Sequence, residues 1–326
     1  MKRENKLLDI LKYAAALLVL ASHCLPIVQN ESINFFYGQW FFRFCVPFFI
    51  ISSGYFFASF QEKGRITYIK RIAVLYLVSS LLYLPAYIKA GAGVFLKNLI
   101  LGGYHLWYLS ALVIALSIWF ILEKCPFVNN IFKKAYPIIC VILLCIGVYY
   151  DEYQHVFEIP LLERAGTYIG YIGGSRHALF FVLPMLLIGR FLFEHKRVMK
   201  LSKATCIMMT IACFAVSFAE CVGLRYYVGE YITCDVTFFN FLPAIFLFIL
   251  TFVWQPKLLD NISTKSLRKN ADVIYIIHIL VLFVVDLIFD VTYMYRLLLV
   301  LIVSIIVSQV YLKLSDIIKS KIKSKH

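Results

Sequence analysis

Charged residues are scarce in this chain, and acidic ones are scarcer than basic ones. Charged residues make up only 15% of the 326, hydrophobic residues make up 62%, and mean hydropathy is +0.83. The apolar runs reach about 20 residues, the length that crosses the hydrocarbon of a bilayer. This composition excludes an ordinary water-soluble domain and predicts an all-α polytopic membrane protein.

Metal-ligand and redox patterns are also missing. The nine cysteines are scattered, mostly within apolar runs, with no CxxC pair and no metal-ligand spacing. We therefore expect no metal, and we interpret the cysteines as small apolar packing residues. Cys221 and Cys234 flank one outer segment and are able to pair, although the sequence does not establish a disulfide.

About ten apolar segments are long enough to be transmembrane helices. They lie at residues 8–28, 40–60, 71–88, 104–122, 135–150, 177–193, 204–222, 235–254, 271–290 and 296–313. The first is too long for the core of a signal peptide, so we expect a retained helix. We predict one transmembrane domain at 1–313 and a basic cytoplasmic tail at 314–326 that contacts lipid headgroups.

The basic residues predict the orientation, because Lys and Arg in short loops hold those loops in the cytoplasm. With both termini inside, the cytoplasmic segments carry 23 of the 32 Lys and Arg residues, and the outer segments carry 6. This split favours an N-in, C-in topology. The same basic residues account for the net charge of +14, because they set the topology and contact membrane lipids. The charge therefore does not indicate a nucleic-acid partner.

His23 is an ionisable residue inside the first predicted span, where lipid makes charge costly. Lys12 precedes it by eleven residues, which places both on nearly one helical face, roughly 16 Å apart. We expect Lys12 in the cytoplasmic half of the membrane and His23 beyond the midplane. The alternative is a hydrogen-bonded core histidine without chemistry.

The second predicted span combines Arg43 near its outer end with Pro47 and Gly54. Proline removes a helical hydrogen bond and glycine permits close approach, so we expect a kinked, tightly packed helix. By itself, Arg43 is explained equally well by snorkelling to headgroups.

Five short motifs occur in order along the chain, and together they resemble the membrane acyltransferase-3 family. They are the Lys12 to His23 spacing, Arg43 to Tyr55, His105 to Leu112, Ser175 to Phe180 and Tyr275 to His278. Within that family, His23 to Pro26 and the stretch from Glu220 through Asp235 to Pro243 are similar to the membrane domain of vancomycin-resistance serine racemases. Those proteins continue into a cytoplasmic pyridoxal-phosphate racemase. Since this chain stops soon after its last predicted span, we expect no racemase activity in it.

The resemblance implies an integral membrane O-acyltransferase of the bacterial plasma membrane. Such a protein moves an acyl group, usually acetyl, from cytoplasmic acetyl-CoA to a hydroxyl of an extracytoplasmic glycan or another small hydroxylated acceptor. His23 would be the catalytic base or the acyl relay, since its unperturbed pKa lies near neutrality. We expect supporting catalytic roles for Glu220 and His278.

Donor binding needs cations for the phosphates of acetyl-CoA, and we expect Lys12, Lys70 and Arg71 to supply them. An ordinary positive-inside pair is the competing interpretation of Lys70 and Arg71. The family more often has Arg where this chain has Lys12, and lysine loses the bidentate guanidinium fork.

Acceptor binding is expected from outer polar and aromatic residues. The candidates are Arg43, His105, Trp107, Tyr108, Arg176 and Asp235. Trp107 and Tyr108 are equally typical of the interfacial aromatic belt. A carboxylate within a span is costly unless it is paired, so we predict Arg43 or Arg176 as the partner of Glu220.

A serine transporter or recognition module is the main alternative. Arg43 and Arg176 with Glu220 and Asp235 would pair with the carboxylate and ammonium groups of an amino acid. A structural anchor for another enzyme is a third possibility. The sequence leaves the acyl chain, the acceptor and the oligomeric state open.

Overall fold

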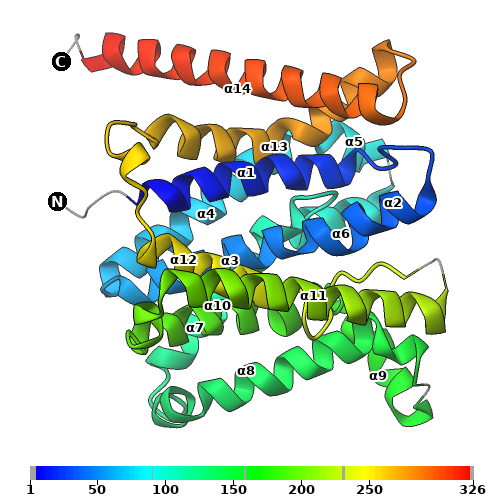
Figure 1. Cartoon of the computed structure of the whole chain (residues 1–326), viewed down its shortest axis with the longest axis vertical. Coiled ribbons are helices and arrows are strands. Elements are labelled where there is room, and N and C mark those ends of the chain that lie inside the picture. The colour runs from blue at the N-terminus through cyan, green and yellow to red at the C-terminus, as the bar shows by residue number, and fades with distance from the viewer. Residues whose placement is uncertain (1–4, 90, 158, 230–231, 324–326) are drawn as a thin grey trace. The chain divides into compact units, whose positions relative to one another are not determined.

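The structure is a computed structural model that describes residues 5–89, 91–157, 159–229 and 232–323 (Figure 1). Within these ranges the chain forms helices joined by turns, with no strand. The predicted all-α class is therefore confirmed. Two compact units are present, and each is described separately.

The terminal unit combines described residues of Met1–Gly38 and Trp254–His326. Its helices are α1 (Lys6–His23), α2 (Glu31–Phe35), α13 (Lys265–Ile288) and α14 (Tyr293–Lys323). α1 packs along α13, and α13 packs along α14. The beginning of α1 and the end of α14 lie at the same end of this unit (Figure 1).

The central unit spans Gln39–Val253. Its helices are α3 (Cys45–Ser59), α4 (Glu62–Leu82), α5 (Leu84–Lys89), α6 (Ala92–Leu101), α7 (Trp107–Lys124), α8 (Asn129–Asp151), α9 (Pro160–Tyr171), α10 (Leu183–Glu194), α11 (Lys203–Val228) and α12 (Leu242–Val253). α3 packs most extensively against α10, and α12 packs against α11 and α3.

Two glycines allow α3 and α10 to pack this closely. A Cβ added at Gly54 would lie 2.2 Å from the Leu186 carbonyl oxygen, and one at Gly189 would lie 2.2 Å from the Ile51 carbonyl oxygen. Only a residue without a side chain fits at such a backbone crossing. The close approach predicted at Gly54 is therefore confirmed.

Six helices are long and apolar enough to cross a membrane, among the described residues. They are Glu31–Ser59, Trp107–Lys124, Asn129–Asp151, Lys203–Val228, Lys265–Ile288 and Tyr293–Lys321. The other four predicted spans correspond to α1, α4, α10 and α12, of which α10 and α12 have only 12 residues each. The count of ten spans and the N-in, C-in orientation stay predictions.

Several predicted segments differ from the observed helices at their ends. The predicted span 8–28 ends at His23, because a residue before proline disfavours helical geometry and Pro26 follows closely. The predicted span 235–254 becomes helical only at Leu242, since the side-chain amide of Asn240 donates to the carbonyls of Cys234 and Asp235. The predicted tail from 314 continues α14 as a helix to Lys323.

The second predicted span is also interrupted rather than continuous. A π-helical turn covers Phe36–Trp40 and a 3-10 turn covers Phe41–Phe44 before α3 begins. Pro47 therefore lies in the first turn of α3, where a missing N–H costs little, and not in the middle of a span.

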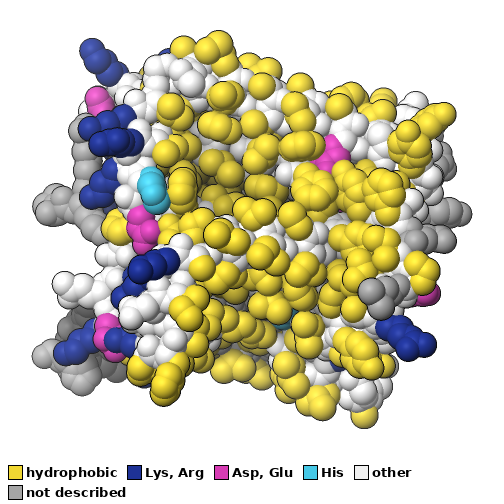
Figure 2. Space-filling model, turned by 90° about the horizontal axis from the view of Figure 1, so that it is seen from below, with side chains coloured by type: hydrophobic (Ala, Val, Ile, Leu, Met, Phe, Trp, Pro, Cys, Tyr) yellow, Lys and Arg dark blue, Asp and Glu magenta, His cyan; other side chains and the backbone are white. Residues whose placement is uncertain are grey.

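The surface of the described helices is strongly apolar. Side chains such as Val141 of α8, Ile211 of α11 and Ile302 of α14 are more than half exposed. Figure 2 shows one face on which hydrophobic side chains form a broad band and Lys and Arg side chains gather toward one edge. This distribution is typical of a multi-pass membrane protein.

Candidate functional sites

His23 and His278 lie side by side in the terminal unit. Their ring centroids are 5.2 Å apart and their planes are inclined by 41°. His23 ends α1 and is exposed, whereas His278 of α13 is only 1% exposed. An exposed imidazole therefore rests against a buried one.

The hydrogen bond of His278 fixes the orientation of its ring. Its Nδ1 lies 3.1 Å from the carbonyl oxygen of Ile274, and a carbonyl only accepts. Nδ1 therefore carries a proton and ties the ring to its own helix.

Lys12 lies on the same uninterrupted helix as His23, as predicted. Its charged neighbours in the terminal unit are Asp272, Asp9 and Arg268. Asp9 is buried and accepts a hydrogen bond of 2.8 Å from the Thr264 hydroxyl. The Lys12 end of α1 thus carries a compact group of mixed charge.

Arg43 and Arg176 converge on Asp235 in the central unit. Each guanidinium pairs with one oxygen of that carboxylate. Arg176 also donates to Asp151 over 2.9 Å and to the Thr233 hydroxyl over 2.8 Å. We call Arg43, Asp151, Glu152, Arg176, Thr233 and Asp235 the arginine–carboxylate cluster. Three predicted acceptor residues, Arg43, Arg176 and Asp235, are therefore brought together.

Glu152 completes this cluster. It is 2% exposed, and its carboxyl accepts from the Asp235 amide over 2.9 Å and from the Thr233 hydroxyl over 3.1 Å. Burial, together with the neighbouring Asp151 carboxylate, raises the pKa of Glu152 to about 8. A neutral Glu152 leaves two arginines opposite two carboxylates, so the charges within the cluster balance near neutral pH.

Glu220 holds a turn and not an arginine. Its two oxygens accept from the amides of Phe238 and Phe239 over 2.8 and 2.9 Å, and from the Tyr153 hydroxyl over 2.9 Å. Three donors offset the cost of the charge. The predicted pairing of Glu220 with Arg43 or Arg176 is therefore wrong, and the contacts favour a structural role.

His105, Trp107 and Tyr108 lie where α7 begins. His105 is buried and packs edge-on against Tyr83 at 5.3 Å, while Trp107 and Tyr108 are half-buried in the first turn of α7. Among the described contacts, none joins these three residues to the arginine–carboxylate cluster. Their acceptor-binding role stays a prediction.

A buried histidine of the Ser175–Phe180 motif contacts the helix that follows His105. His177 Nε2 lies 3.1 Å from both the Ser110 hydroxyl and the Leu101 carbonyl. Arg176, the preceding residue, belongs to the arginine–carboxylate cluster and pairs there with Asp151. Two motifs that are distant in sequence are thus adjacent in the fold.

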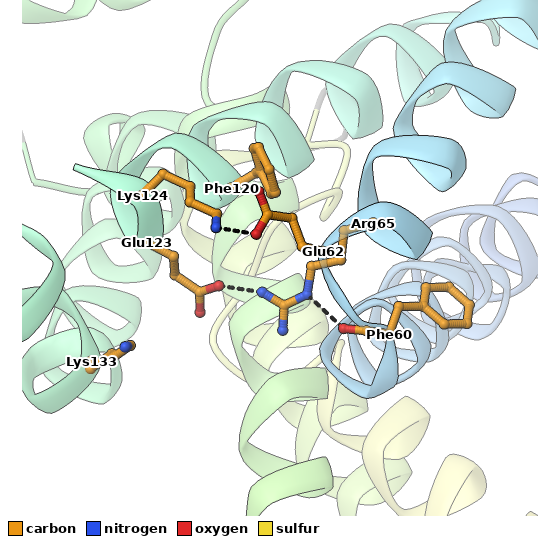
Figure 3. A pocket seen from close by; sticks show the side chains of 7 residues that line it. All are labelled: Phe60, Glu62, Arg65, Phe120, Glu123, Lys124 and Lys133. Atoms are coloured by element: carbon orange, nitrogen blue, oxygen red, sulfur yellow. Dashed lines mark hydrogen bonds and ion pairs between the residues drawn. The ribbon is translucent and has the colours of Figure 1, made fainter. Parts of the chain in front are cut away.

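A cavity of about 270 Å³ lies where α4, α7 and α8 meet (Figure 3). Its lining residues are Phe60, Glu62, Arg65, Phe120, Glu123, Lys124 and Lys133. Arg65 pairs with Glu123, and Lys124 pairs with Glu62, whereas Lys133 reaches the cavity from α8. Glu123 also forms an ion pair with buried Arg190 at an N···O distance of 2.9 Å, which anchors this wall. Lys70 and Arg71, the predicted donor residues of α4, are exposed outside this lining.

Asp151 and Glu152 are site residues that the sequence interpretation missed. They are adjacent carboxylates directly after a long apolar segment, so their cost near lipid was a usable signal. What sequence alone did not reveal is that two distant arginines meet them.

The all-α fold, its apolar helices and its paired charges define a multi-pass membrane protein. The chain belongs to the family described as acyltransferase domain, which it matches over residues 5–313. The match covers nearly the whole chain, so the resemblance to membrane acyltransferases is confirmed.

Relatives are found among racemases of enterococci. One amino-acid racemase of Enterococcus faecalis is 27% identical over 313 residues, covering 87% of this chain and 42% of the relative. A serine/alanine racemase of Enterococcus gallinarum is 27% identical over 275 residues, covering 78% of this chain and 38% of the relative. The chain thus spans less than half the length of these relatives. No solved structure matches the chain.

Proposed function

We propose that this protein is an O-acyltransferase that moves an acetyl group from acetyl-CoA to a hydroxyl of an extracytoplasmic glycan or cell-envelope acceptor. The observation that carries the proposal is the exposed imidazole of His23 against the buried ring of His278. Membership of the acyltransferase family supports the same chemistry.

His23 acts as the general base in this proposal. Its imidazole takes the proton of the acceptor hydroxyl while the oxygen attacks the thioester carbonyl. The carbon–sulfur bond then breaks, and the imidazolium returns the proton to the departing CoA thiolate. A positioned base of this kind contributes about 10²- to 10⁴-fold to the rate.

His278 is the positioning residue for His23. With Nδ1 donating to the Ile274 carbonyl, Nε2 of His278 is assigned in this proposal to accept from an N–H of the neighbouring His23 imidazole. Such a bond would select the tautomer of His23 whose other nitrogen accepts the hydroxyl proton. The buried ring also limits the rotation of its exposed neighbour.

The cavity between α4, α7 and α8 is the proposed site of the donor phosphates. Three cations and two carboxylates line it, so its net charge is positive. Lys133 is the side chain most available to a phosphate, since Arg65 and Lys124 already pair with carboxylates. Lys12, Lys70 and Arg71 stay as secondary candidates for donor binding.

The arginine–carboxylate cluster is the proposed acceptor site. Planar guanidinium groups and carboxylates form strong directed hydrogen bonds with hydroxyl-rich molecules. Glu152 and Asp151 hold Arg176 and the Asp235 amide in place, so the acceptor would meet a preorganised surface.

Serine transport is the second candidate, and the same cluster favours it. Two arginines and three carboxyl groups within contact of one another suit a zwitterion as well as a sugar. One relative is named a serine/alanine racemase and another an amino-acid racemase, and both names are consistent with such a substrate.

The two candidates are separated by one preparation of proteoliposomes. Protein given acetyl-CoA and an envelope glycan extract should release CoA and label the glycan, without accumulating labelled L-serine. Uptake of serine without CoA release would contradict acyl transfer and support transport.

A further inference from the structure

Three consecutive polar residues of the Ser175–Phe180 motif form hydrogen bonds in two directions. Ser175 and Arg176 both donate to the Asp151 carboxylate, over 2.7 and 2.9 Å. His177 has extended backbone, and its ring bonds instead to groups of α6 and α7. One short segment therefore joins the arginine–carboxylate cluster to these two helices.

The ring of His177 closes the carboxyl end of α6. Leu101 is the last residue of that helix, so its carbonyl has no partner within the helix. Nε2 of His177 lies 3.1 Å from this carbonyl and 3.1 Å from the Ser110 hydroxyl of α7. That hydroxyl donates to the same carbonyl over 2.7 Å. Since a carbonyl only accepts, Nε2 carries a proton, and the three groups tie the segment 175–177 to α6 and α7.

The turn before His177 is built around the imidazole ring. Gly173 has a φ of 107°, a conformation that favours glycine, and a Cβ added there would lie 2.5 Å from Cγ of His177. The carbonyl of His177 accepts from the amides of Phe181 and Val182, over 3.3 and 3.2 Å. The side chain and the backbone of His177 are thus both held. The Cα of Arg176, one residue earlier, is fixed with them.

We propose that His177 is the positioning residue for Arg176 in the acceptor site. It fixes the start of the arginine side chain relative to α6 and α7, so that the guanidinium meets Asp151, Thr233 and Asp235 at once. His177 acts through Arg176 and touches no substrate. The inference rests on the proposed role of the arginine–carboxylate cluster in acceptor binding.

Positioning matters for Arg176 because its side chain is 44% exposed. Exposed ion pairs lose much of their strength to water and to the entropy of long side chains. A fixed backbone lowers that entropy cost, so the acceptor meets a guanidinium already in place. The donor cavity is lined at the opposite end of α7, by Phe120, Glu123 and Lys124. Loss of the His177 imidazole should therefore weaken acceptor binding and leave donor binding unchanged.

Steady-state kinetics of the purified full chain, with acetyl-CoA and the envelope glycan acceptor, test this role. His177→Leu keeps a side chain of similar size and removes the Nε2 hydrogen bonds. KM for the acceptor should rise by about 5- to 10-fold, while kcat and KM for acetyl-CoA should stay within about 2-fold of wild type. His177→Gln, whose side-chain amide also donates, should recover most of the acceptor affinity.

A double-mutant cycle separates positioning of Arg176 from a general loss of structure. If His177 acts through Arg176, adding His177→Leu to Arg176→Gln should raise KM for the acceptor no further. Two independent effects would multiply in the double variant, and that result would overturn the proposal.

Tyr76 of α4 supplies the matched control. Its hydroxyl donates to the carbonyls of Asn98 and Leu99, over 3.3 and 2.8 Å, so it closes the same end of α6. Among the described hydrogen bonds, none joins Tyr76 to the segment 175–177. Tyr76→Phe should leave KM for the acceptor unchanged. A rise as large as in His177→Leu would mean that any loss at this helix end weakens acceptor binding, which would contradict a specific role of His177.

Arginine modification gives a readout that needs no acyl transfer. Phenylglyoxal reacts with guanidinium groups, and peptide mass spectrometry compares its rate at Arg176 with its rate at the exposed Arg164. This ratio should rise by about 2- to 5-fold in folded His177→Leu, the range expected for loss of an exposed ion pair. An unchanged ratio would overturn the proposal even where acyl transfer is observed. A raised ratio without acyl transfer would support the positioning of Arg176 and contradict only the proposed function.

Ser110→Ala takes the place of His177→Leu if that variant does not fold. It removes the hydroxyl that lies 3.1 Å from Nε2 of His177. KM for the acceptor and the phenylglyoxal ratio should then both rise by about 2-fold, as the loss of one hydrogen bond predicts. Unchanged values of both in folded Ser110→Ala would overturn the proposal.

Discussion

The exposed ring of His23 lies 5.2 Å from the buried ring of His278, and the Nδ1–H of His278 is committed to the Ile274 carbonyl. The ring of His278 is therefore held in one orientation beside His23. A relationship of this kind positions a base without competing for the substrate.

Loss of the His278 imidazole should slow catalysis rather than weaken substrate binding. We expect His278→Leu to lower kcat for acyl transfer by about 10- to 100-fold, with little change in KM, because His23 loses its orienting acceptor. His278→Gln, which retains an acceptor near the Nε2 position, should recover part of the rate. Equal rates for wild type and His278→Leu would rule out the positioning role.

The arginine–carboxylate cluster should determine acceptor affinity. Arg176→Gln removes a guanidinium that pairs with Asp151 and Asp235, and we expect KM for the acceptor to rise by about 10-fold or more. KM for acetyl-CoA should stay unchanged in the same variant.

Arg164→Gln is the matched control for that measurement, since Arg164 is an exposed arginine of α9. It should behave as wild type in both assays. A similar loss of acceptor affinity in the two variants would indicate a general surface-charge effect and would remove the cluster from the acceptor site.

Glu152 should make stability depend on pH. Its pKa is raised from 4.5 to about 8 in the folded protein, so its contribution to stability is fully present below about pH 4.5. That contribution is lost as pH rises toward and through about 8. We expect Tm in detergent to fall by a few degrees more between about pH 5 and about pH 8 in wild type than in Glu152→Gln. If Tm falls equally with pH in wild type and in Glu152→Gln, then Glu152 is ionised in the folded protein and the raised pKa is contradicted.

The crossing of α3 and α10 should tolerate no side chain at Gly54. A Cβ there would overlap the Leu186 backbone, which cannot move as the end of a side chain can. We expect Gly54→Ala to lower Tm by about 5 °C or more. Gly223→Ala on α11, where a Cβ meets nothing within 4 Å, should leave Tm unchanged or slightly raised. Equal Tm values for the two variants would contradict the crossing.

Much of the fold was predictable because apolar length is a local property of the sequence. Helix α13 and the continuity of Lys12 and His23 in α1 follow from such runs. The ends of helices depended instead on capping by residues such as Asn240 and on Pro26. Short helices such as α12 were overestimated, because apolar residues also fill the packed turns around them.

The candidate site was predictable only in part. Arg43, Arg176 and Asp235 were predicted as outer polar residues of an acceptor site, and the three do meet. The predicted partner of Glu220 was wrong because backbone amides satisfy its carboxylate as well as an arginine would. No sequence pattern shows which backbone amides will lie near a carboxylate. Asp151 and Glu152 were missed because their importance arises from tertiary contacts.

Release of CoA from acetyl-CoA by the purified full chain, in detergent and with an envelope glycan acceptor, is the most direct test of His23 as the base. Wild type should release CoA and acetylate the acceptor. In His23→Ala, the rate of CoA release should be lower than in wild type by about 10²-fold or more, at an unchanged Tm. Undiminished CoA release and acceptor acetylation by folded His23→Ala would contradict His23 as the base of this reaction.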